Sequence, residues 1–231
     1  MNQLGEQSFD QMKVKIPQER DRAVNDYIRC ISRPLVEQVP QLGDFNSWEI
    51  VVFKDESPNA FALPGSKIGV HTGILKVAKT DAQLAAVLGH EIGHVQAKHG
   101  NERVSTQFGM QLGLVGLSEI LGNKRDMKTQ GILLAAMGVA TLGVQLPFSR
   151  NHESEADEIG LGIMSRAGFD PRESVALWKN MMSTGKGQPP EFLSTHPSNE
   201  SRIRGLEAKM PEAMKAYQAA QSAGKKPHCQ L

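Results

Sequence analysis

The sequence contains few aromatic residues and no excess of charge of either sign. Aromatic side chains make up 5% of the 231 residues, and 26 basic residues balance 25 acidic ones to leave a net charge of +1. Proteins that bind nucleic acid need a basic surface for the phosphates, and many also need rings on which bases stack. This composition offers neither, so we expect no nucleic-acid partner.

Cysteine is also scarce, with only Cys30 and Cys229 present and no CxxC spacing that would suggest a metal knuckle. An even count favours a single disulfide in an oxidising compartment, and the alternative is two unrelated free thiols. The first residues, MNQLGEQSFDQ, lack the basic and apolar regions of a signal peptide. We therefore expect either a cytosolic protein or a trimmed mature form.

No apolar run reaches the ~20 residues that a membrane-spanning helix requires. Residues 106–147 contain two glycine-rich apolar runs separated by the polar stretch NKRDMKTQ, and Glu119 interrupts the first run. Closely spaced glycines let two helices approach tightly, so the pattern predicts a buried or interfacial helical hairpin. Peripheral contact with a membrane or an outer-membrane assembly is the alternative for this segment.

Hydrophobic periodicity and turn residues predict one mainly helical domain with a small sheet. The expected strands, within a region at about 48–75, are 48–53, 59–63 and 67–71. The expected helical regions are about 1–42, 81–99, 106–147 and 151–167, followed by a helix that starts after Asp170, a loop at 185–199 and two short closing helices.

The stretch LGHEIGHVQAKHG, residues 88–100, lies inside the helix that Thr80 and Gln83 are expected to cap. His90 and His94 are one turn apart, so both imidazoles project from one face and can reach a zinc ion at about 2.0–2.1 Å. Glu91 points off that face. It can take a proton from an attacking water and pass it to a leaving amine.

A catalytic zinc needs a third protein ligand and an open fourth position. His99 is not expected to serve, because nine residues after His90 it points elsewhere. Glu153 and Asp157 are four residues apart on one helix face, so the first can bind zinc while the second orients a ligating histidine. The alternative is that these acids are a solvated helix N-terminus favoured by the helix dipole.

HEIGH, followed about sixty residues later by ESEAD, resembles the zinc endopeptidase family that includes HtpX and the CAAX prenyl proteases. Under this resemblance Glu153 is the third zinc ligand, and Ala156 and Asp157 complete the motif. NAFALPG at 59–65 and KIGVHTG at 67–73 resemble the family's strand segment before the active helix. The sequence Thr195-His196-Pro197, with Arg202 soon after, resembles its C-terminal histidine motif.

The resemblance implies a gluzincin-type α+β domain, mainly helical, with a small sheet beside the active-site helix and one Zn(II) per chain. It also implies an edge strand that binds extended substrate by β-augmentation, through Asn59, Ala60, Phe61 and Ala62. Residues 106–147 are too short and interrupted for spanning helices, which favours the soluble periplasmic branch. A periplasmic location agrees with the cysteines, and a lipoprotein anchor would belong to a longer precursor.

Three roles are open for His196: a donor to the oxyanion, a fourth zinc ligand that keeps the enzyme latent as in a soluble member of the family, or a loop histidine without a role. Arg202 is a candidate for contact with substrate or with an acid behind the zinc ligands, and an exposed helix charge is its alternative.

The sequence therefore predicts a zinc-dependent endopeptidase acting on unfolded or misassembled envelope proteins, with Glu91 activating the water. A latent, chaperone-like binding module stabilised by zinc is one alternative, and Glu91 argues against it because a protein that never cuts has no need of that acid. A membrane-interaction protein acting through residues 106–147 and an exopeptidase are the others. The sequence leaves the oligomeric state open.

Overall fold

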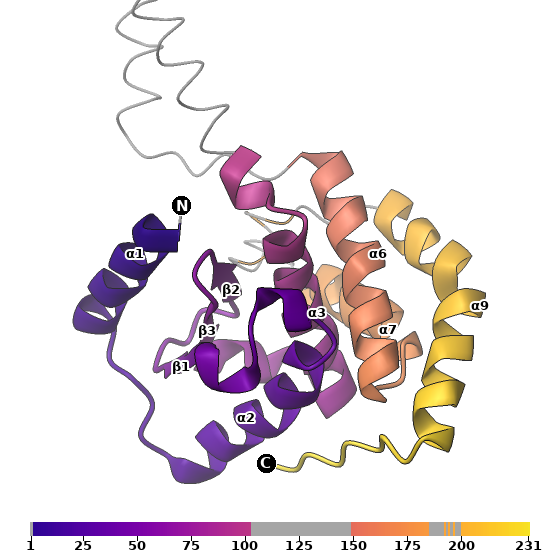
Figure 1. The fold of residues 1–231 in the computed structure, drawn as a ribbon, viewed down its shortest axis with the longest axis horizontal. Helices are drawn as coiled ribbons and strands as arrows, with labels where there is room; N and C mark the ends of the chain where they lie inside the picture. The colour runs from indigo at the N-terminus through magenta and orange to yellow at the C-terminus, as the bar shows by residue number, and fades with distance from the viewer. Residues whose placement is uncertain (1, 103–148, 185–191, 193, 195, 197–199) are drawn as a thin grey trace, which may run out of the picture.

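The structure, a computed structural model, describes residues 2–102, 149–184, 192, 194, 196 and 200–231 (Figure 1). The predicted hairpin at 106–147 lies outside the described residues, as do Thr195 and Pro197. The helices are α1 (Asn2–Lys15), α2 (Arg22–Val36), α3 (Asp81–Gln96), α6 (Arg150–Ala167), α7 (Arg172–Thr184) and α9 (Glu200–Ser222). The strands are β1 (Glu49–Phe53), β2 (Ala60–Leu63) and β3 (Lys67–His71).

This architecture confirms the expected mainly helical α+β fold with a small sheet. The strands are ordered β1-β3-β2, with β1 parallel and β2 antiparallel to β3. Strand β2 is therefore an edge strand of the sheet. Among the described residues, no helix has both the length and the apolar character needed to cross a bilayer.

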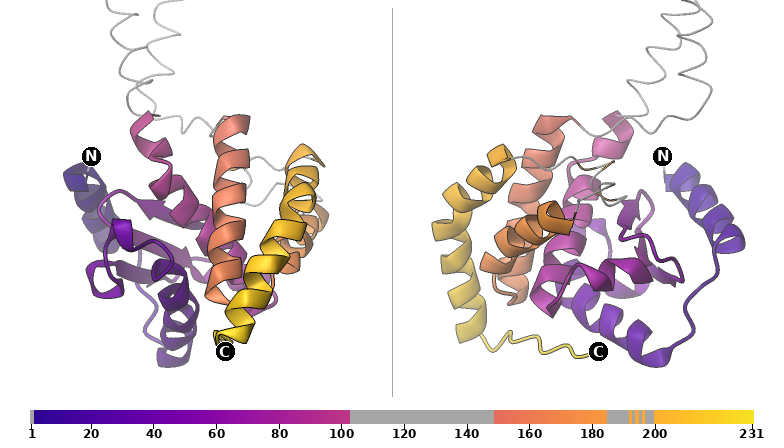
Figure 2. Two further views of the ribbon diagram at one scale, coloured as in Figure 1. Left: turned by 45° about the vertical axis from the view of Figure 1, so that its right-hand side comes forward. Right: turned by 180° about the vertical axis from the view of Figure 1, so that it is seen from behind.

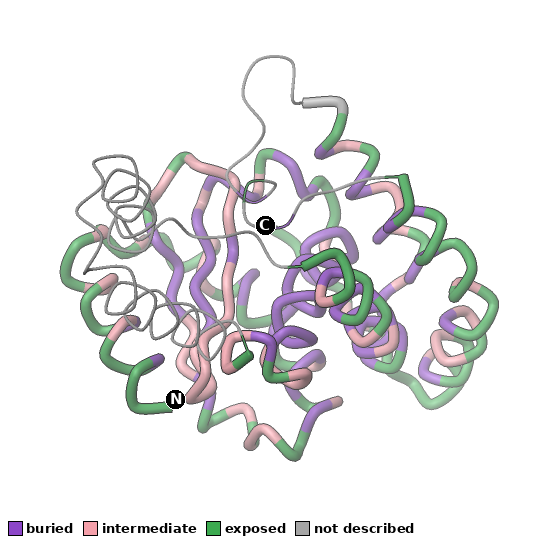
Figure 3. The backbone as a smooth tube through the Cα atoms, turned by 90° about the horizontal axis from the view of Figure 1, so that it is seen from above, coloured by how far each residue is buried: buried purple, intermediate pink, exposed green. Residues whose placement is uncertain are grey.

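Helix α3 runs through the middle of the described fold, between the sheet on one side and α6 and α7 on the other (Figure 1). Every residue from Ala82 to His94 is buried, as the continuous purple of this helix shows (Figure 3). The Thr80 hydroxyl accepts a hydrogen bond from the Gln83 N–H at 3.1 Å, which is the expected N-cap. The Gln83 side chain in turn accepts from the Lys79 N–H at 2.8 Å. A helix buried on all sides starts at a well-defined residue because of this cap.

The chain closes with one long helix, α9, rather than the two short helices expected. Pro211 lies inside α9 without ending it. Helix α9 runs beside α6 (Figure 2), and its buried residues include Arg202, Leu206, Ala213 and Ala220. These positions fall on one face over five turns, so packing on the fold's core holds the helix together across the proline.

Glycines bring the backbones of α3 and α6 almost into contact. A Cβ atom added at Gly93 would lie 2.8 Å from the Ala156 carbonyl oxygen, and one added at Gly160 would lie 2.7 Å from the His90 nitrogen. Real Cβ atoms do not approach backbone so closely, so only glycine permits this spacing between the two helices. The sequence ExxAD and the glycines of LGHEIGH are therefore packed against each other.

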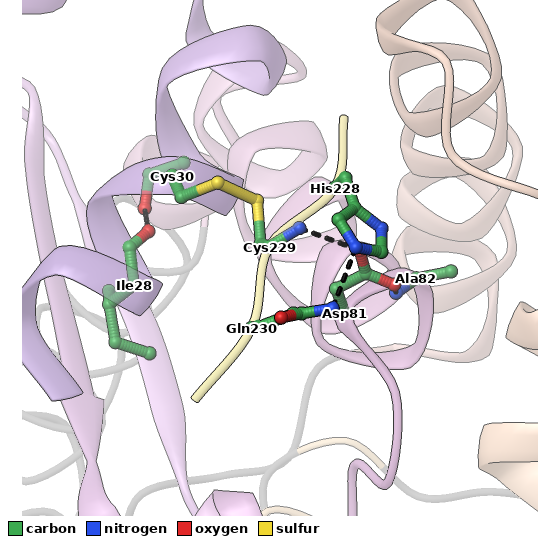
Figure 4. The surroundings of a disulfide bond; sticks show 8 residues. Ile28, Cys30, Asp81, Ala82, His228, Cys229 and Gln230 are labelled. Carbon is green, nitrogen blue, oxygen red and sulfur yellow. Dashed lines mark hydrogen bonds between the residues drawn. A yellow bond between two sulfur atoms is a disulfide. The ribbon is translucent and has the colours of Figure 1, made fainter. Parts of the chain in front are cut away.

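The two cysteines form a disulfide that joins α2 to the extended C-terminal tail (Figure 4), the pairing that the sequence favours. Beside it, the Cys229 N–H donates to the Asp81 carboxylate at 3.3 Å. The tail is thereby attached both to α2 and to the first residue of α3.

Replacing Gly93 with alanine is expected to lower the free energy of unfolding by about 1–3 kcal/mol, because the new methyl group must push α6 away. Urea unfolding of the zinc-free chain measures this. Gly205→Ala is the matched control, since a Cβ at Gly205 has no atom within 4 Å. Removal of that helix-interior glycine should leave stability unchanged or raise it by up to about 1 kcal/mol. Equal effects of the two substitutions would contradict the packing described here.

Candidate metal centre

Four side chains from three parts of the chain meet in the interior. His90 and His94 come from α3, Glu153 comes from the first turn of α6, and His196 comes from the segment before α9. All four are buried, and their candidate ligand atoms lie within 4.8 Å of one another. The structure therefore brings together the two motifs that the sequence singled out, and adds His196 to them.

The distances within this cluster fit a tetrahedral ion. The Nε2 atoms of His90 and His94 are 3.0 Å apart, and His196 Nδ1 is 3.2 Å from His90 Nε2 and 3.1 Å from Glu153 Oε1. Ligands placed about 2.0–2.1 Å from a tetrahedral zinc ion are separated from each other by roughly 3.3 Å. Imidazole nitrogens and a carboxylate oxygen are also donors that zinc accepts. The residues present thus fit the ion that the sequence predicts.

Asp157 and Arg202 lie behind the ligands. The Asp157 carboxylate is 3.0 Å from His90 Nδ1, and it accepts two hydrogen bonds of 2.7 Å from the Arg202 guanidinium. The third nitrogen of that guanidinium, Nη1, lies 2.6 Å from Glu153 Oε2. Asp157 thereby fixes the ring of His90 so that its Nε2 faces the cluster.

Arg202 is buried among the groups behind the metal ligands. Its side chain is only 2% exposed, and its guanidinium lies 3.9 Å from the centre of the Trp178 ring. Both its charge and its planar face are used within the fold, by carboxylates and by an indole. Of the three alternatives left open by the sequence, these contacts favour an arginine that pairs with acids behind the metal ligands, and its burial argues against an exposed helix charge.

Burial and neighbouring charges give the two α3 histidines opposite character. Burial lowers the pKa of His94 to about 3. Burial also acts to lower the pKa of His90, but hydrogen bonds to Asp157 and Glu153 outweigh it and raise that pKa to about 9. In the metal-free chain His90 is therefore a cation that can donate to His94. Metal binding must release this proton, because a ligating nitrogen needs its lone pair.

Glu91 lies beside the cluster, between the sheet and His196. Its Oε2 accepts a hydrogen bond from the Ala62 N–H at 3.3 Å, and its Oε1 is 3.4 Å from His196 Nε2. Burial raises the pKa of Glu91 above that of an ordinary glutamate. A carboxylate with a raised pKa holds a proton more readily near neutral pH, which suits a group that accepts a proton and then gives it up.

Three aromatic contacts were not evident in the sequence. Phe192 stacks on His196 with ring centres 4.6 Å apart, and Trp178 meets His90 edge to face at 6.0 Å. His99, which does not join the ligand cluster, instead reaches His94, with the two Nδ1 atoms 3.0 Å apart.

Helix α3 ends at Gln96, and Lys98 adopts a positive φ of 59°. Extrapolating the helix to residue 99 therefore gives the wrong direction for this side chain.

Substituting Arg202 with methionine is expected to destabilise the zinc-free chain by about 3–5 kcal/mol, because Asp157 and Glu153 would lose the guanidinium that pairs with both and keep only His90 as a cationic partner. Chemical denaturation compared with the parent chain tests this. Arg204→Met is the control on the same helix, where the side chain is 68% exposed and should matter by less than about 0.5 kcal/mol. A small effect at Arg202 would show that its ion pairs are not needed for stability.

Comparison with known proteins agrees with the site. A family model described as "Peptidase family M48" matches residues 22–210. The chain is 40% identical over 168 residues to "Mitochondrial metalloendopeptidase OMA1" of Schizosaccharomyces pombe, which covers 72% of this chain and 48% of the relative. It is 39% identical over 180 residues to the protein of the same name from Saccharomyces cerevisiae, covering 74% and 49%.

A further relative is "Beta-barrel assembly-enhancing protease" of Escherichia coli K12, which is 27% identical over 205 residues. That match covers 87% of this chain and 42% of the relative. The chain thus spans about half or less of the length of these curated relatives.

Proposed function

We propose that this chain, which belongs to peptidase family M48, is a zinc-dependent endopeptidase that cleaves unfolded or misassembled proteins. Membership of the family confirms the resemblance read from HEIGH and ESEAD. The observation that carries the proposal is the buried group of His90, His94 and Glu153 with Glu91 beside it. The metal is assigned as zinc, one per chain, because its ligands are two imidazoles and a carboxylate at tetrahedral spacing.

The residues divide the work of peptide hydrolysis among them. His90, His94 and Glu153 hold the zinc, which when bound supplies a Lewis acid for the scissile carbonyl and for activation of water. Glu91 takes the proton of the attacking water and gives it to the leaving amine. Asp157 keeps His90 oriented, and Arg202 keeps Asp157 ionised: burial would raise the pKa of Asp157, but hydrogen bonds from Arg202 and His90 lower it overall.

His196 is the proposed latency switch. A catalytic zinc site keeps one coordination position open for substrate, and His196 Nδ1 lies within the ligand cluster where that position would be. Its Nε2 also faces Glu91 at 3.4 Å. With His196 in this place substrate would be excluded from that position, so cleavage would require the His196 side chain to leave it. The alternative is that His196 swings out only slightly and donates to the oxyanion.

Degradation of unfolded casein, with zinc content read on the same samples, tests these roles. Glu91→Gln should retain one zinc and lose about 10²–10⁴ of the cleavage rate, because only the proton carrier is removed. His196→Ala should raise the rate by about tenfold if the closed form makes up about 90% of the protein. A lower rate in His196→Ala would assign His196 to catalysis instead.

Two results would contradict the endopeptidase proposal. If the parent chain, Glu91→Gln and His196→Ala all hold zinc and none cuts casein, the alternative of a zinc-stabilised, chaperone-like binding module is favoured. If none holds zinc, the metal assignment is wrong.

Substrate is proposed to pair with the outer edge of β2. The His71 N–H donates to the Asn59 carbonyl, and Phe61 is paired in register with Gly69. Alternation along an antiparallel strand then turns the backbone groups of Ala60 and Ala62 away from β3. The Ala62 N–H indeed points to Glu91, so a peptide added at this edge would lie beside the zinc ligands.

This narrows the four candidate residues to two. The backbone of Asn59 already serves β3, and the ring of Phe61 packs with Phe9 and Phe53 at centroid distances of 6.3 and 6.1 Å. Neither is therefore placed for substrate, whereas the backbone groups of Ala60 and Ala62 face the outer edge, where the Ala62 N–H already donates to Glu91.

Ala62→Pro removes the outward N–H, and with it the hydrogen bond to Glu91, while leaving the bonds to β3 in place. Casein cleavage should therefore fall by about tenfold or more with zinc content unchanged. Ala62→Val is the control, because it alters the side chain and keeps the N–H. Equal activity of the proline variant and the parent would rule out edge pairing at this residue.

The proposed location is the periplasm of a bacterial envelope. The Cys30–Cys229 disulfide supports this proposal, because disulfides persist in oxidising compartments. Thiol trapping of the protein in cells should find both cysteines oxidised. Free thiols would place the protein in a reducing compartment. A lipoprotein anchor in a longer precursor and a contact with an outer-membrane assembly through 106–147 belong to the same proposal.

A further inference from the structure

The third histidine of LGHEIGHVQAKHG lies directly behind a proposed metal ligand. His99 is 1% exposed, and its Nδ1 is 3.0 Å from Nδ1 of His94. The other nitrogen of His99, Nε2, is 3.2 Å from the Glu155 carboxylate on α6. His94, His99 and Glu155 thus form a hydrogen-bonded chain that runs from the ligand cluster to a side chain that is 59% exposed.

The proton positions along this hydrogen-bonded chain of side chains follow from one condition, that His94 binds zinc through Nε2. His94 Nε2 faces the other ligands, so it must offer a lone pair to the zinc, and the proton of the neutral ring is then on Nδ1. Among the described residues, the nitrogen 3.0 Å from it is Nδ1 of His99, which accepts this N–H and is therefore unprotonated. His99 therefore carries its own proton on Nε2, where Glu155 accepts it.

The ring of His99 is held in this orientation by its surroundings. It stacks on the ring of His152 with centroids 4.3 Å apart and planes 22° apart. His152 is itself paired with Glu102 at 3.1 Å. His99 and Glu102 follow α3, whereas His152 and Glu155 belong to α6, so the two histidine–carboxylate pairs cross between the segments that carry the ligands.

We propose that His99 is a positioning residue that holds His94 in the tautomer and orientation required for zinc binding. Asp157 orients His90 in the same way, and Arg202 in turn holds the Asp157 carboxylate in place. The two histidine ligands therefore have different supports, a buried ion pair for one and an imidazole for the other. This inference rests on the proposed zinc site and adds a residue outside the HExxH and ExxAD motifs.

Zinc affinity of two variants, measured by competition with a chelator, tests the proposal. His99→Leu removes the acceptor and is expected to weaken zinc binding by about 10–100-fold, the usual cost of losing such a partner. His99→Asn places a side-chain oxygen near the position of Nδ1, so it should restore affinity to within about threefold of the parent chain. Affinity of His99→Leu equal to the parent would overturn the proposal, as would an asparagine variant as weak as the leucine variant.

A second measurement needs no substitution and so does not depend on whether a variant folds. Side-chain ¹H–¹⁵N correlation spectra of the zinc-loaded parent chain should show His99 protonated on Nε2 and His94 protonated on Nδ1. A proton on Nδ1 of His99 would overturn the inference while leaving the zinc site intact. A parent chain that binds no zinc would overturn the proposed function, and with it the role of His99.

Discussion

The near contact between the backbones of α3 and α6 is the constraint on which the site depends. The ligands come from both helices, and a short glutamate side chain on α6 can reach the two histidines of α3 only if the helix axes are close. Gly93 and Gly160 allow that approach because neither places a Cβ atom between the helices. The same glycines lower the intrinsic stability of each helix, so burial and a well-formed cap must hold α3 in place.

Placing ionised groups in this apolar interior requires that each charge be compensated. Glu153 and Asp157 are almost fully buried, and a single guanidinium from α9 contacts both carboxylates. Removing water from such charges is costly, and the pairing offsets that cost only while the geometry is kept. The start of α9 is therefore tied to the metal centre through Arg202, while packing of its buried face holds the helix together across Pro211.

The residues that support the metal ligands lie on a different side of the centre from the residues near β2. Asp157 and His99 lie behind the two histidine ligands, so they can fix the rings without reaching substrate. His196 and Glu91 lie on the side of β2, where an extended peptide could pair with the edge strand. Under the proposed function, the first pair holds the ligands in place and the second lies where substrate would enter.

Local sequence determined the elements and the motif: the spacing of His90 and His94, the cap at Thr80 and the short apolar strands fix helix and sheet through interactions between near neighbours. It also indicated Glu153 and Asp157 as partners one helical turn apart. Tertiary structure alone decided the rest. His99 lies behind His94, His196 joins the cluster with His90, and Arg202 pairs with Asp157. Each of these contacts depends on turns and on packing between segments that are distant in the sequence. Hydrophobic periodicity describes the faces of one helix at a time. It could not predict these three contacts, because each joins separate segments or crosses the end of a helix.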